Sequence, residues 1–426
     1  MDLSQSSLGK LTSIKSFGDS MYPLLHDGDV VKLRKVPFAG IKTNDIICFQ
    51  KQGKLITHRV LYKSENYLIT RGDNATQADG KVYKGQILGK ITKVKRGKNE
   101  FSPESLYLIQ STVYFQEIVR VTETLKKVGL SFVILKGLPL HLYYEGKHAQ
   151  RLFYDCDILV GRKLFGRFSS VLTDLGYKPV SSDLSKGHKK LKDKEPEVTF
   201  FKDVHGMPVY FDIHLEAVFL MTQLGKLEAL YSQKLLDTFS DELRGNTKNI
   251  SIQDNIFTIL APEYLFIYLA LHLFHHNFTG AYRFELMDAL VKKEKFQYAE
   301  IARIVRQYKL GGFLIPVLLL MRKYYQTEFP RDFLRQIAPD EKKKQYIFKS
   351  IIPKSIFNEE GRVQGGTTRF KMIFLLSQEP MWKKILVFLN RQVIYSVFWV
   401  LILGIRVALR KTLPMNFLVS EKPSKA

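Results

Sequence analysis

The chain has 426 residues, of which 45% are hydrophobic and 25% are charged, and its formal net charge is +24. This composition is typical of folded globular proteins and excludes a long disordered tract, while the length exceeds what one compact core usually serves. The positive charge predicts attraction to a polyanion, such as nucleic acid, an anionic membrane leaflet or a phosphate-rich substrate, without choosing among them.

Two features indicate the compartment. Cys48 and Cys156 lie in apolar runs typical of strands, so buried free thiols are expected rather than a disulfide. The first residues contain no continuous apolar stretch of the kind found in a signal sequence or a membrane-spanning helix. We therefore expect a cytoplasmic protein.

Residues 14–96 alternate short β-rich runs with turns rich in Gly, Asp and Asn, which predicts a small, mainly antiparallel β domain. A polar, turn-rich segment ends at Pro103, and helical periodicity begins beyond it. The sequence therefore predicts a first domain over residues 1–100.

The pattern then becomes mixed, with predicted helices between strands at 131–137 and 155–160 and two further strands between Val198 and Leu215. After residue 255 nearly everything has helical periodicity. This order predicts an α/β core over 101–255, followed by a helical part over 256–380, and so a multidomain protein.

The tail, residues 381–426, contains an apolar run that ends at Ile405 and is bounded by Arg391 and Arg406. The run is too short to span a bilayer comfortably. A helix in the cytoplasmic membrane interface and a helix packed on the domain are both compatible with it.

A group of polar residues in the β domain is suited to nucleophilic catalysis. Ser20 lies in the run Gly-Asp-Ser-Met-Tyr-Pro, and a serine attacks an acyl carbon only when a base takes its proton and N–H groups meet the oxyanion. His58, on a predicted strand, is a residue type suited to that proton transfer. Asp79 follows a Gly-Asp-Asn turn and offers a carboxylate to orient the imidazole. Each residue alone is equally compatible with a structural role.

In this order, the segments resemble the conserved motifs of type I signal peptidases of the endoplasmic-reticulum kind: Ser-Met-x-Pro, a Gly-Asp pair, His-Arg-Val and Gly-Asp-Asn followed by Asp79. The resemblance covers residues 16–95 and implies a serine endopeptidase. It makes Ser20 the nucleophile and a donor to the oxyanion, His58 the general base and Asp79 the orienting acid, with Asp73 and Asn74 supporting the turn.

Two departures from the motifs bear on the activity. No membrane helix precedes the serine, and Gly18 has no side-chain donor, which leaves the oxyanion to backbone N–H groups. We expect a cytoplasmic relative that cleaves a peptide or protein partner. The alternative is a domain that binds a peptide without cleaving it.

The α/β core contains a pair of carboxylates suited to metal binding. Asp155 and Asp157 are two residues apart on one predicted strand, so their side chains project to the same side. Mg²⁺ ions that bridge a nucleoside triphosphate require such a pair. Asp212 lies on a later predicted strand, and a solvated strand edge would also explain the aspartate pair alone.

Residues 105–410 resemble the polymerase-β-type nucleotidyltransferase superfamily, and more closely a group of uncharacterised nucleotidyltransferases with Leu-Lys-Gly, Asp-x-Asp and Asp-x-His motifs. The resemblance implies that Asp155 and Asp157 bind Mg²⁺ and that Asp212 completes the metal site or acts as the base. Its other implied site residues contact the phosphates of the triphosphate substrate, namely Lys136, Gly137 and Arg151.

The group also carries a histidine stretch and a following aspartate, which correspond here to residues 272–276 and Asp288. His272, His275 and His276 share a helix face at spacings of three and four, so they would form a metal site or line a core or a substrate cleft.

These observations predict a bifunctional protein in which an endopeptidase trims a peptide and a Mg²⁺-dependent nucleotidyltransferase transfers a nucleotide to an unknown acceptor. One alternative is a peptide-binding clamp joined to an active transferase. Another is a protein that binds the inner membrane surface or nucleic acid and whose sites are vestigial, although the sequence makes nucleic acid the less favoured partner.

Overall fold

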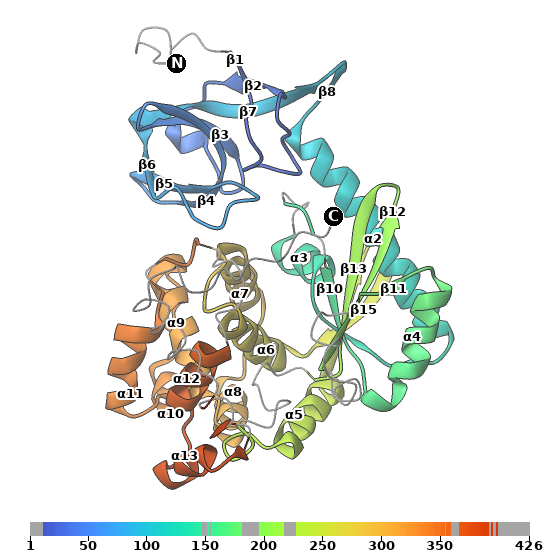
Figure 1. The fold of residues 1–426 in the computed structure, drawn as a ribbon, viewed down its shortest axis with the longest axis vertical. Helices are drawn as coiled ribbons and strands as arrows, with labels where there is room; N and C mark the ends of the chain where they lie inside the picture. Colours follow the sequence, from blue (N-terminus) through green and yellow to red (C-terminus); the bar gives the residue numbers. More distant parts are fainter. Residues whose placement is uncertain are drawn as a thin grey trace, which may run out of the picture.

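The computed structural model describes residues 12–146, 151–153, 155–180, 196–216, 227–353, 355–358, 366–391, 393–394 and 398. Figure 1 shows a β domain at one end of the molecule, a sheet flanked by helices beside it, and a helical part that completes the other end. Helix α2 (Pro103–Lys127) leads from the β domain along the second sheet.

The β domain is one antiparallel sheet with strand order β1-β2-β7-β3-β4-β5-β6, and β8 pairs with β7. Its strands are β1 (Ser13–Lys15), β2 (Val30–Arg34), β3 (Ile46–Lys51), β4 (Lys54–Lys63), β5 (Tyr67–Arg71), β6 (Lys81–Tyr83), β7 (Ile87–Arg96) and β8 (Asn99–Phe101). The predicted antiparallel β domain is therefore confirmed. Two small apolar clusters fill it, one around Met21, Leu24 and Leu25 and the other around Phe49 and Val60.

The second sheet is mixed, with strand order β11-β12-β13-β10-β9-β15-β14. Its strands are β9 (Val133–Lys136), β10 (Asp155–Leu159), β11 (Lys178–Pro179), β12 (Glu197–Val204), β13 (Met207–His214), β14 (Thr247–Ile252) and β15 (Asn255–Leu260). Strand β10 is parallel to β13 and antiparallel to β9. Helices α2, α3 (Leu138–Glu145) and α4 (Phe165–Asp174) accompany it.

Two segments differ from the sequence-based expectation. The polar segment before Pro103 contains the β7–β8 hairpin, whose short turn is polar because it is exposed. Strand β15 begins at Asn255, where helical structure was predicted, so that prediction was wrong up to Leu260. Phe257 and Ile259, two residues apart on β15, are buried, whereas Ile256 is exposed. Gln253 and Asp254 form a tight turn at positive φ that pairs β15 with β14.

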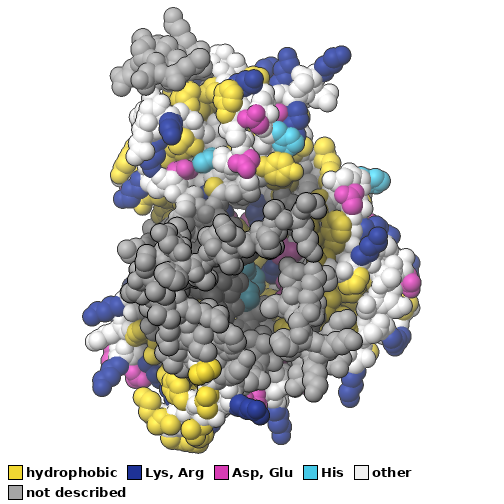
Figure 2. Space-filling view, viewed as in Figure 1, with side chains coloured by type: hydrophobic (Ala, Val, Ile, Leu, Met, Phe, Trp, Pro, Cys, Tyr) yellow, Lys and Arg dark blue, Asp and Glu magenta, His cyan; other side chains and the backbone are white. Residues whose placement is uncertain are grey.

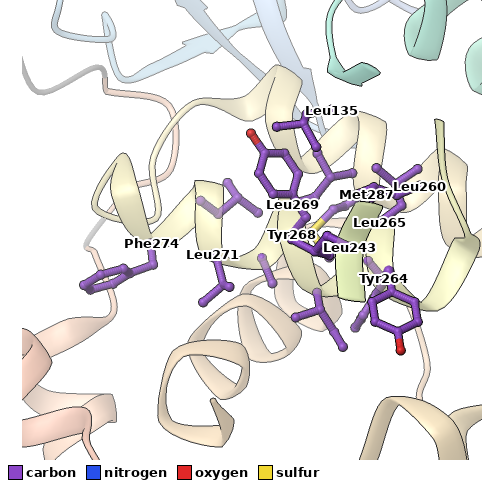
Figure 3. Packing of buried hydrophobic residues seen from close by; sticks show 14 of the residues in the cluster. Leu135, Leu243, Leu260, Tyr264, Leu265, Tyr268, Leu269, Leu271, Phe274 and Met287 are labelled. Carbon is purple, nitrogen blue, oxygen red and sulfur yellow. The ribbon is translucent and has the colours of Figure 1, made fainter. Parts of the chain in front are cut away.

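The helical part contains α5 (Gln233–Gly245), α6 (Pro262–His275), α7 (Ala281–Lys293), α8 (Tyr298–Gln307), α9 (Gly311–Tyr325), α10 (Arg331–Ile337), α11 (Glu341–Tyr346), η7 (Ile347–Ile351), α12 (Gly366–Leu376) and α13 (Met381–Phe388). Helix α6 is its centre, since every residue from Tyr264 to Phe274 is buried. Figure 3 shows α6 enclosed by Leu135 of β9, Leu260 of β15 and Met287 of α7. A helix that is apolar on all sides is stable only inside such a core.

The β domain is joined to the rest of the chain by buried polar contacts. The Arg59 guanidinium forms two hydrogen bonds with the Asp73 carboxylate, at 2.6 and 2.5 Å, and also donates to the hydroxyl of Tyr107 on α2. Arg71 donates a hydrogen bond of 3.0 Å to the carbonyl of Phe357, which lies between η7 and α12 of the helical part. These contacts fix the loop after β5 against two different elements.

Cys48 and Cys156 are buried free thiols, as predicted. No helix within the described residues is long and apolar enough to cross a bilayer. Most of the predicted tail helix, from residue 399 onward, lies outside the described residues.

Candidate functional site

Ser20, His58 and Asp79 meet in the β domain although they are far apart in the sequence. Nε2 of His58 lies 3.0 Å from Oγ of Ser20, and its Nδ1 lies 2.7 Å from Oδ2 of Asp79. The same Asp79 oxygen accepts a hydrogen bond of 2.8 Å from the Thr70 hydroxyl. In this arrangement the imidazole is placed to accept the proton of the Ser20 hydroxyl, and the Asp79 carboxylate is placed to orient the imidazole.

The loop after β5 holds this arrangement together through Gly72 and Asn74. The Asn74 N–H donates a 2.8 Å hydrogen bond to the Ser20 carbonyl, and its side-chain amide donates to the Asp19 carbonyl at 3.2 Å. A Cβ atom at Gly72 would lie 2.4 Å from the Ser20 carbonyl oxygen and 2.9 Å from Nε2 of His58. Only glycine therefore allows the loop to approach both residues.

Backbone N–H groups near Ser20 are the candidate donors to an oxyanion, and one of them is already used. Gly18 has φ +83°, and its N–H donates a 2.8 Å hydrogen bond to the Asp27 carboxylate, so this N–H is already used. The N–H of Ser20 itself, which the sequence analysis assigned to the oxyanion, keeps that role as a prediction.

Asp155, Asp157 and Asp212 come together at the centre of the second sheet. Asp155 and Asp157 lie on β10, and Asp212 pairs with Asp157 across the parallel β10–β13 ladder. One oxygen from each of the three carboxylates lies within 4.8 Å of the others. Because three carboxylates repel one another unless a cation lies between them, this cluster is suited to a hard divalent ion.

Lys136, at the end of β9, is the cation that lies against this cluster. Its Nζ is 2.6 Å from Oδ2 of Asp155 and 2.8 Å from Oδ2 of Asp157. Burial alone would lower the pKa of the Lys136 ammonium, but the charges of Asp157 and Asp155 outweigh it and raise this pKa well above its usual value. The ammonium therefore partly neutralises the carboxylates that would bind a metal.

The three aspartates have different environments. Burial opposes ionisation of Asp155, but the Lys136 charge outweighs it and lowers the Asp155 pKa. Burial and the charge of Asp157 raise the pKa of Asp212 to about 7, despite a 2.7 Å hydrogen bond from the Thr199 hydroxyl. The cluster thus combines an acidic carboxylate with one that binds a proton more readily.

His214 is hydrogen-bonded to one carboxylate of the cluster. Its Nε2 lies 2.7 Å from Oδ1 of Asp157, and both side chains are buried. Burial would lower the pKa of His214, but the hydrogen bond to Asp157 and the charge of Glu197 raise it. Neither His214 nor Thr199 was given a role from the sequence. A signal for His214 was present, because it lies two residues after Asp212 and faces the same side of β13.

The residues assigned to phosphate binding lie near the cluster. Gly137 has φ +116° and precedes α3, and a Cβ atom there would lie 3.1 Å from the Asp155 carbonyl oxygen. The Arg151 guanidinium stacks on the rings of Phe153 and Tyr282, with distances to the ring centroids of 4.0 and 4.3 Å. Contact of Lys136, Gly137 and Arg151 with a triphosphate stays a prediction.

The histidine stretch does not form a second metal cluster. In the described part of the chain, the aspartates at 155, 157 and 212 are the only set of three or more potential ligands that converge. His272 is buried, and burial together with the neighbouring His276 lowers its pKa well below the usual value. This favours the alternative in which the stretch lines a core and a cleft. Asp288 is also engaged elsewhere, because it accepts hydrogen bonds from Thr327 and Lys292.

A cleft of about 710 Å³ lies between the β domain and the second sheet. Tyr22, Pro23 and Asn74 line it beside the Ser20 turn, and Lys136 and Asp155 line it beside the aspartate cluster. Acidic, basic and histidine side chains are visible in the hollow at the centre of Figure 2. The volume is in the range of pockets that hold small ligands and cofactors.

Three carboxylates that a mixed sheet gathers beside a cleft are suited to a divalent cation and a phosphorylated ligand. The family model of the uncharacterised nucleotidyltransferases matches residues 105–326, just over half of the chain. The chain belongs to this family and has a nucleotidyltransferase-like domain, as the resemblance implied.

A crystal structure of an antigenic nucleotidyltransferase-like protein from Paracoccidioides brasiliensis is similar over 49% of this chain and 92% of that chain, with 13% identity and a TM-score of 0.26. A similarity at this level carries no argument about function. No curated protein matches the chain.

Proposed function

We propose that the chain is a metal-dependent nucleotidyltransferase joined to a serine endopeptidase domain. The observation that carries the first half is the convergence of Asp155, Asp157 and Asp212 within the domain that the family model matches. The acceptor would attack the α-phosphorus of a nucleoside triphosphate, forming a bond to phosphorus while the bond to pyrophosphate breaks.

The aspartates fit Mg²⁺ by their chemistry. Oδ2 of the buried Asp157 accepts no hydrogen bond from the described residues, and only the Lys136 ammonium faces it at 2.8 Å. Asp155, Asp157 and Asp212 would hold the ion, which when bound would offset the negative charge of the triphosphate. His214 orients Asp157, and Thr199 orients Asp212, which would complete the metal site or take the proton of the acceptor.

The transferase half is tested by incubating the protein with nucleoside triphosphates, Mg²⁺ and a peptide library, and measuring pyrophosphate release and the mass of the products. We expect Asp155→Asn and Asp157→Asn to abolish release. Asp174→Asn, an exposed aspartate at the end of α4, is the matched control and should behave as wild type. Equal release by all variants would refute the assignment.

A specific observation also favours the endopeptidase half. The distances of 3.0 Å from His58 to Ser20 and 2.7 Å from His58 to Asp79 suit proton transfer from the hydroxyl through the imidazole. Ser20 would attack a peptide carbonyl, and the C–N bond would break as His58 returns the proton to the leaving amine. Water would then hydrolyse the acyl-enzyme.

Cleavage of a peptide library read by mass spectrometry separates this proposal from a peptide-binding clamp. Loss of cleavage in Ser20→Ala, with nucleotide transfer retained, is the expected result. If Ser20→Ala leaves every activity unchanged while the wild type binds peptides, the clamp is the better description.

We also propose that the protein acts in the cytoplasm, with the membrane surface as a further partner of its tail. Figure 2 shows apolar side chains gathered at the end of the molecule where Figure 1 places α13, and Met381, Trp382 and Ile385 are among the exposed ones. Sedimentation with anionic vesicles should decrease when salt is added, since Lys383 lies beside the exposed Trp382 on this face. No sedimentation at low salt would refute the proposal.

A further inference from the structure

Two arginines share one aromatic ring in the wall of the cleft. The Arg151 guanidinium lies 4.3 Å from the centroid of the Tyr282 ring, and the Arg283 guanidinium lies 4.5 Å from the same centroid. The Arg151 guanidinium also lies 4.0 Å from the centroid of the Phe153 ring. Aromatic faces attract guanidinium groups and hold their planes in place, but they use none of the N–H donors.

The charges of these arginines are poorly compensated. Within the described residues neither guanidinium forms an ion pair, and the polar contact of Arg283 is a long hydrogen bond of 3.4 Å to the Thr279 carbonyl. The Nε of Arg283 is buried and has no hydrogen-bond partner among the residues that the structure describes. Burial lowers the pKa of Arg151 and outweighs the charges of Glu145 and Glu285, which raise it. An anion that contacts both guanidinium groups would stabilise two such neighbouring cations.

The backbone around Gly280 is built to hold Arg283 in this position. Gly280 has φ +95°, and a Cβ atom there would overlap the guanidinium of Arg283. The N–H of Gly280 donates a 2.8 Å hydrogen bond to the carbonyl of Ile356, which fixes the start of α7. Arg283 therefore lies in the first turn of a helix whose start is anchored.

Both arginines and Tyr282 line the same cleft as Lys136 and Asp155. The charges of Arg151 and Arg283 help to lower the pKa of Asp155, so the arginines and the carboxylates are close enough to contact adjacent parts of one triphosphate. The carboxylates would hold the metal near the reacting phosphorus, while planar guanidinium groups suit the oxygens of the leaving pyrophosphate.

We propose that Arg151 and Arg283, stacked on Tyr282, bind the β- and γ-phosphates of the nucleotide. This inference rests on the proposed nucleotidyl transfer and adds Arg283 and Tyr282 to its binding site. Arg283 has no counterpart among the residues singled out from the sequence.

The test is calorimetric titration of the full chain with inorganic pyrophosphate and then with a non-hydrolysable nucleoside triphosphate. We expect Arg283→Ala to raise Kd for both ligands by about ten- to a hundredfold, the effect of losing hydrogen bonds to a charged group. Tyr282→Ala should weaken binding about three- to thirtyfold, and Tyr282→Phe should restore it because the ring is retained. Arg335→Ala, at an exposed arginine on α10, is the matched control and should bind as wild type.

An Arg283→Ala variant that keeps the wild-type melting temperature and the wild-type Kd for pyrophosphate would overturn the inference, as would a wild type that does not bind pyrophosphate. Kinetic measurements distinguish failure of the proposed arginine site from failure of the proposed nucleotidyl transfer. Transfer with an unchanged KM for nucleotide in Arg283→Ala would refute the arginine site alone. Arginine-dependent binding of pyrophosphate without any transfer would leave the anion site standing and refute the transferase.

Discussion

Replacing Gly72 by alanine should disable the Ser20 site while leaving the β domain folded. The added Cβ would lie 2.4 Å from the Ser20 carbonyl oxygen and 2.9 Å from Nε2 of His58, and contacts below 3.0 Å are not tolerated. The φ of Gly72 is not among the positive values of the chain, so the effect would come from overlap and not from backbone strain.

The size of the effect follows from these distances. The Ser20 carbonyl must move by about 0.6 Å to reach a 3.0 Å separation, and a comparable shift of Oγ would lengthen its 3.0 Å contact with His58 to about 3.6 Å. A misplacement of this order at a nucleophile lowers the rate by about a hundredfold. Overpacking of the loop should cost about 1–3 kcal/mol of stability.

The assay is the rate at which a fluorophosphonate labels Ser20, followed by mass spectrometry, with Ser20→Ala as background. Gly85→Ala is the matched control, since a Cβ there meets no atom within 4 Å. We expect slow labelling only in the Gly72 variant. Labelling of a folded Gly72→Ala protein at the wild-type rate would refute the argument that this close approach positions the serine.

Three further variants test other parts of the structure. Lys136→Met removes the ammonium from Asp155 and Asp157, so the variant should lose about 3–5 kcal/mol of unfolding free energy in the absence of metal. Mg²⁺ should raise the melting temperature of this variant more than that of the wild type. Equal increases in the two melting temperatures would contradict this expectation. Asp29→Asn should destabilise the β domain by about 1–3 kcal/mol at neutral pH, because Asp29 pairs with Arg96 at 2.8 Å. Burial opposes ionisation of Asp29, but Arg96 outweighs it and lowers the Asp29 pKa. The difference in unfolding free energy between variant and wild type should therefore shrink as pH falls below about 4. Denaturant titrations that give the same difference at every pH would refute this expectation. Arg59→Met leaves Asp73 and the Tyr107 hydroxyl without their shared partner, so the labelling of Ser20 should become slower. Amide hydrogen exchange in the loop after β5 should become faster, because this loop loses its contact with α2. Unchanged exchange in this loop would contradict the expectation.

Local patterns were sufficient to predict several features. The period-two spacing of Asp155 and Asp157 placed both carboxylates on one side of β10, and the alternating runs before residue 96 gave the antiparallel sheet. The order of Ser20, His58 and Asp79 indicated a triad, and their approach to hydrogen-bonding distance agrees with that geometry, while the activity remains a proposal.

Features that depend on packing between distant segments could not be predicted. The position of Lys136 against the aspartates depends on the register of β9 beside β10, which the sequence does not reveal. The pairing of Arg151 with Arg283 joins segments that are more than a hundred residues apart through Tyr282. Strand β15 was assigned to the helical part because a short apolar run fits either period, and only its pairing with β14 and β9 decides it.

The most direct test of the nucleotidyl-transfer account is to follow label from a nucleoside triphosphate marked either at the α- or at the γ-phosphorus, in the presence of Mg²⁺ and acceptor. If the protein transfers nucleotides, the α-label becomes bound to the acceptor and the γ-label leaves as pyrophosphate. The Asp157→Asn variant should neither transfer the α-label nor release the γ-label. Transfer of the γ-label, or transfer of the α-label that survives in Asp157→Asn, would contradict it.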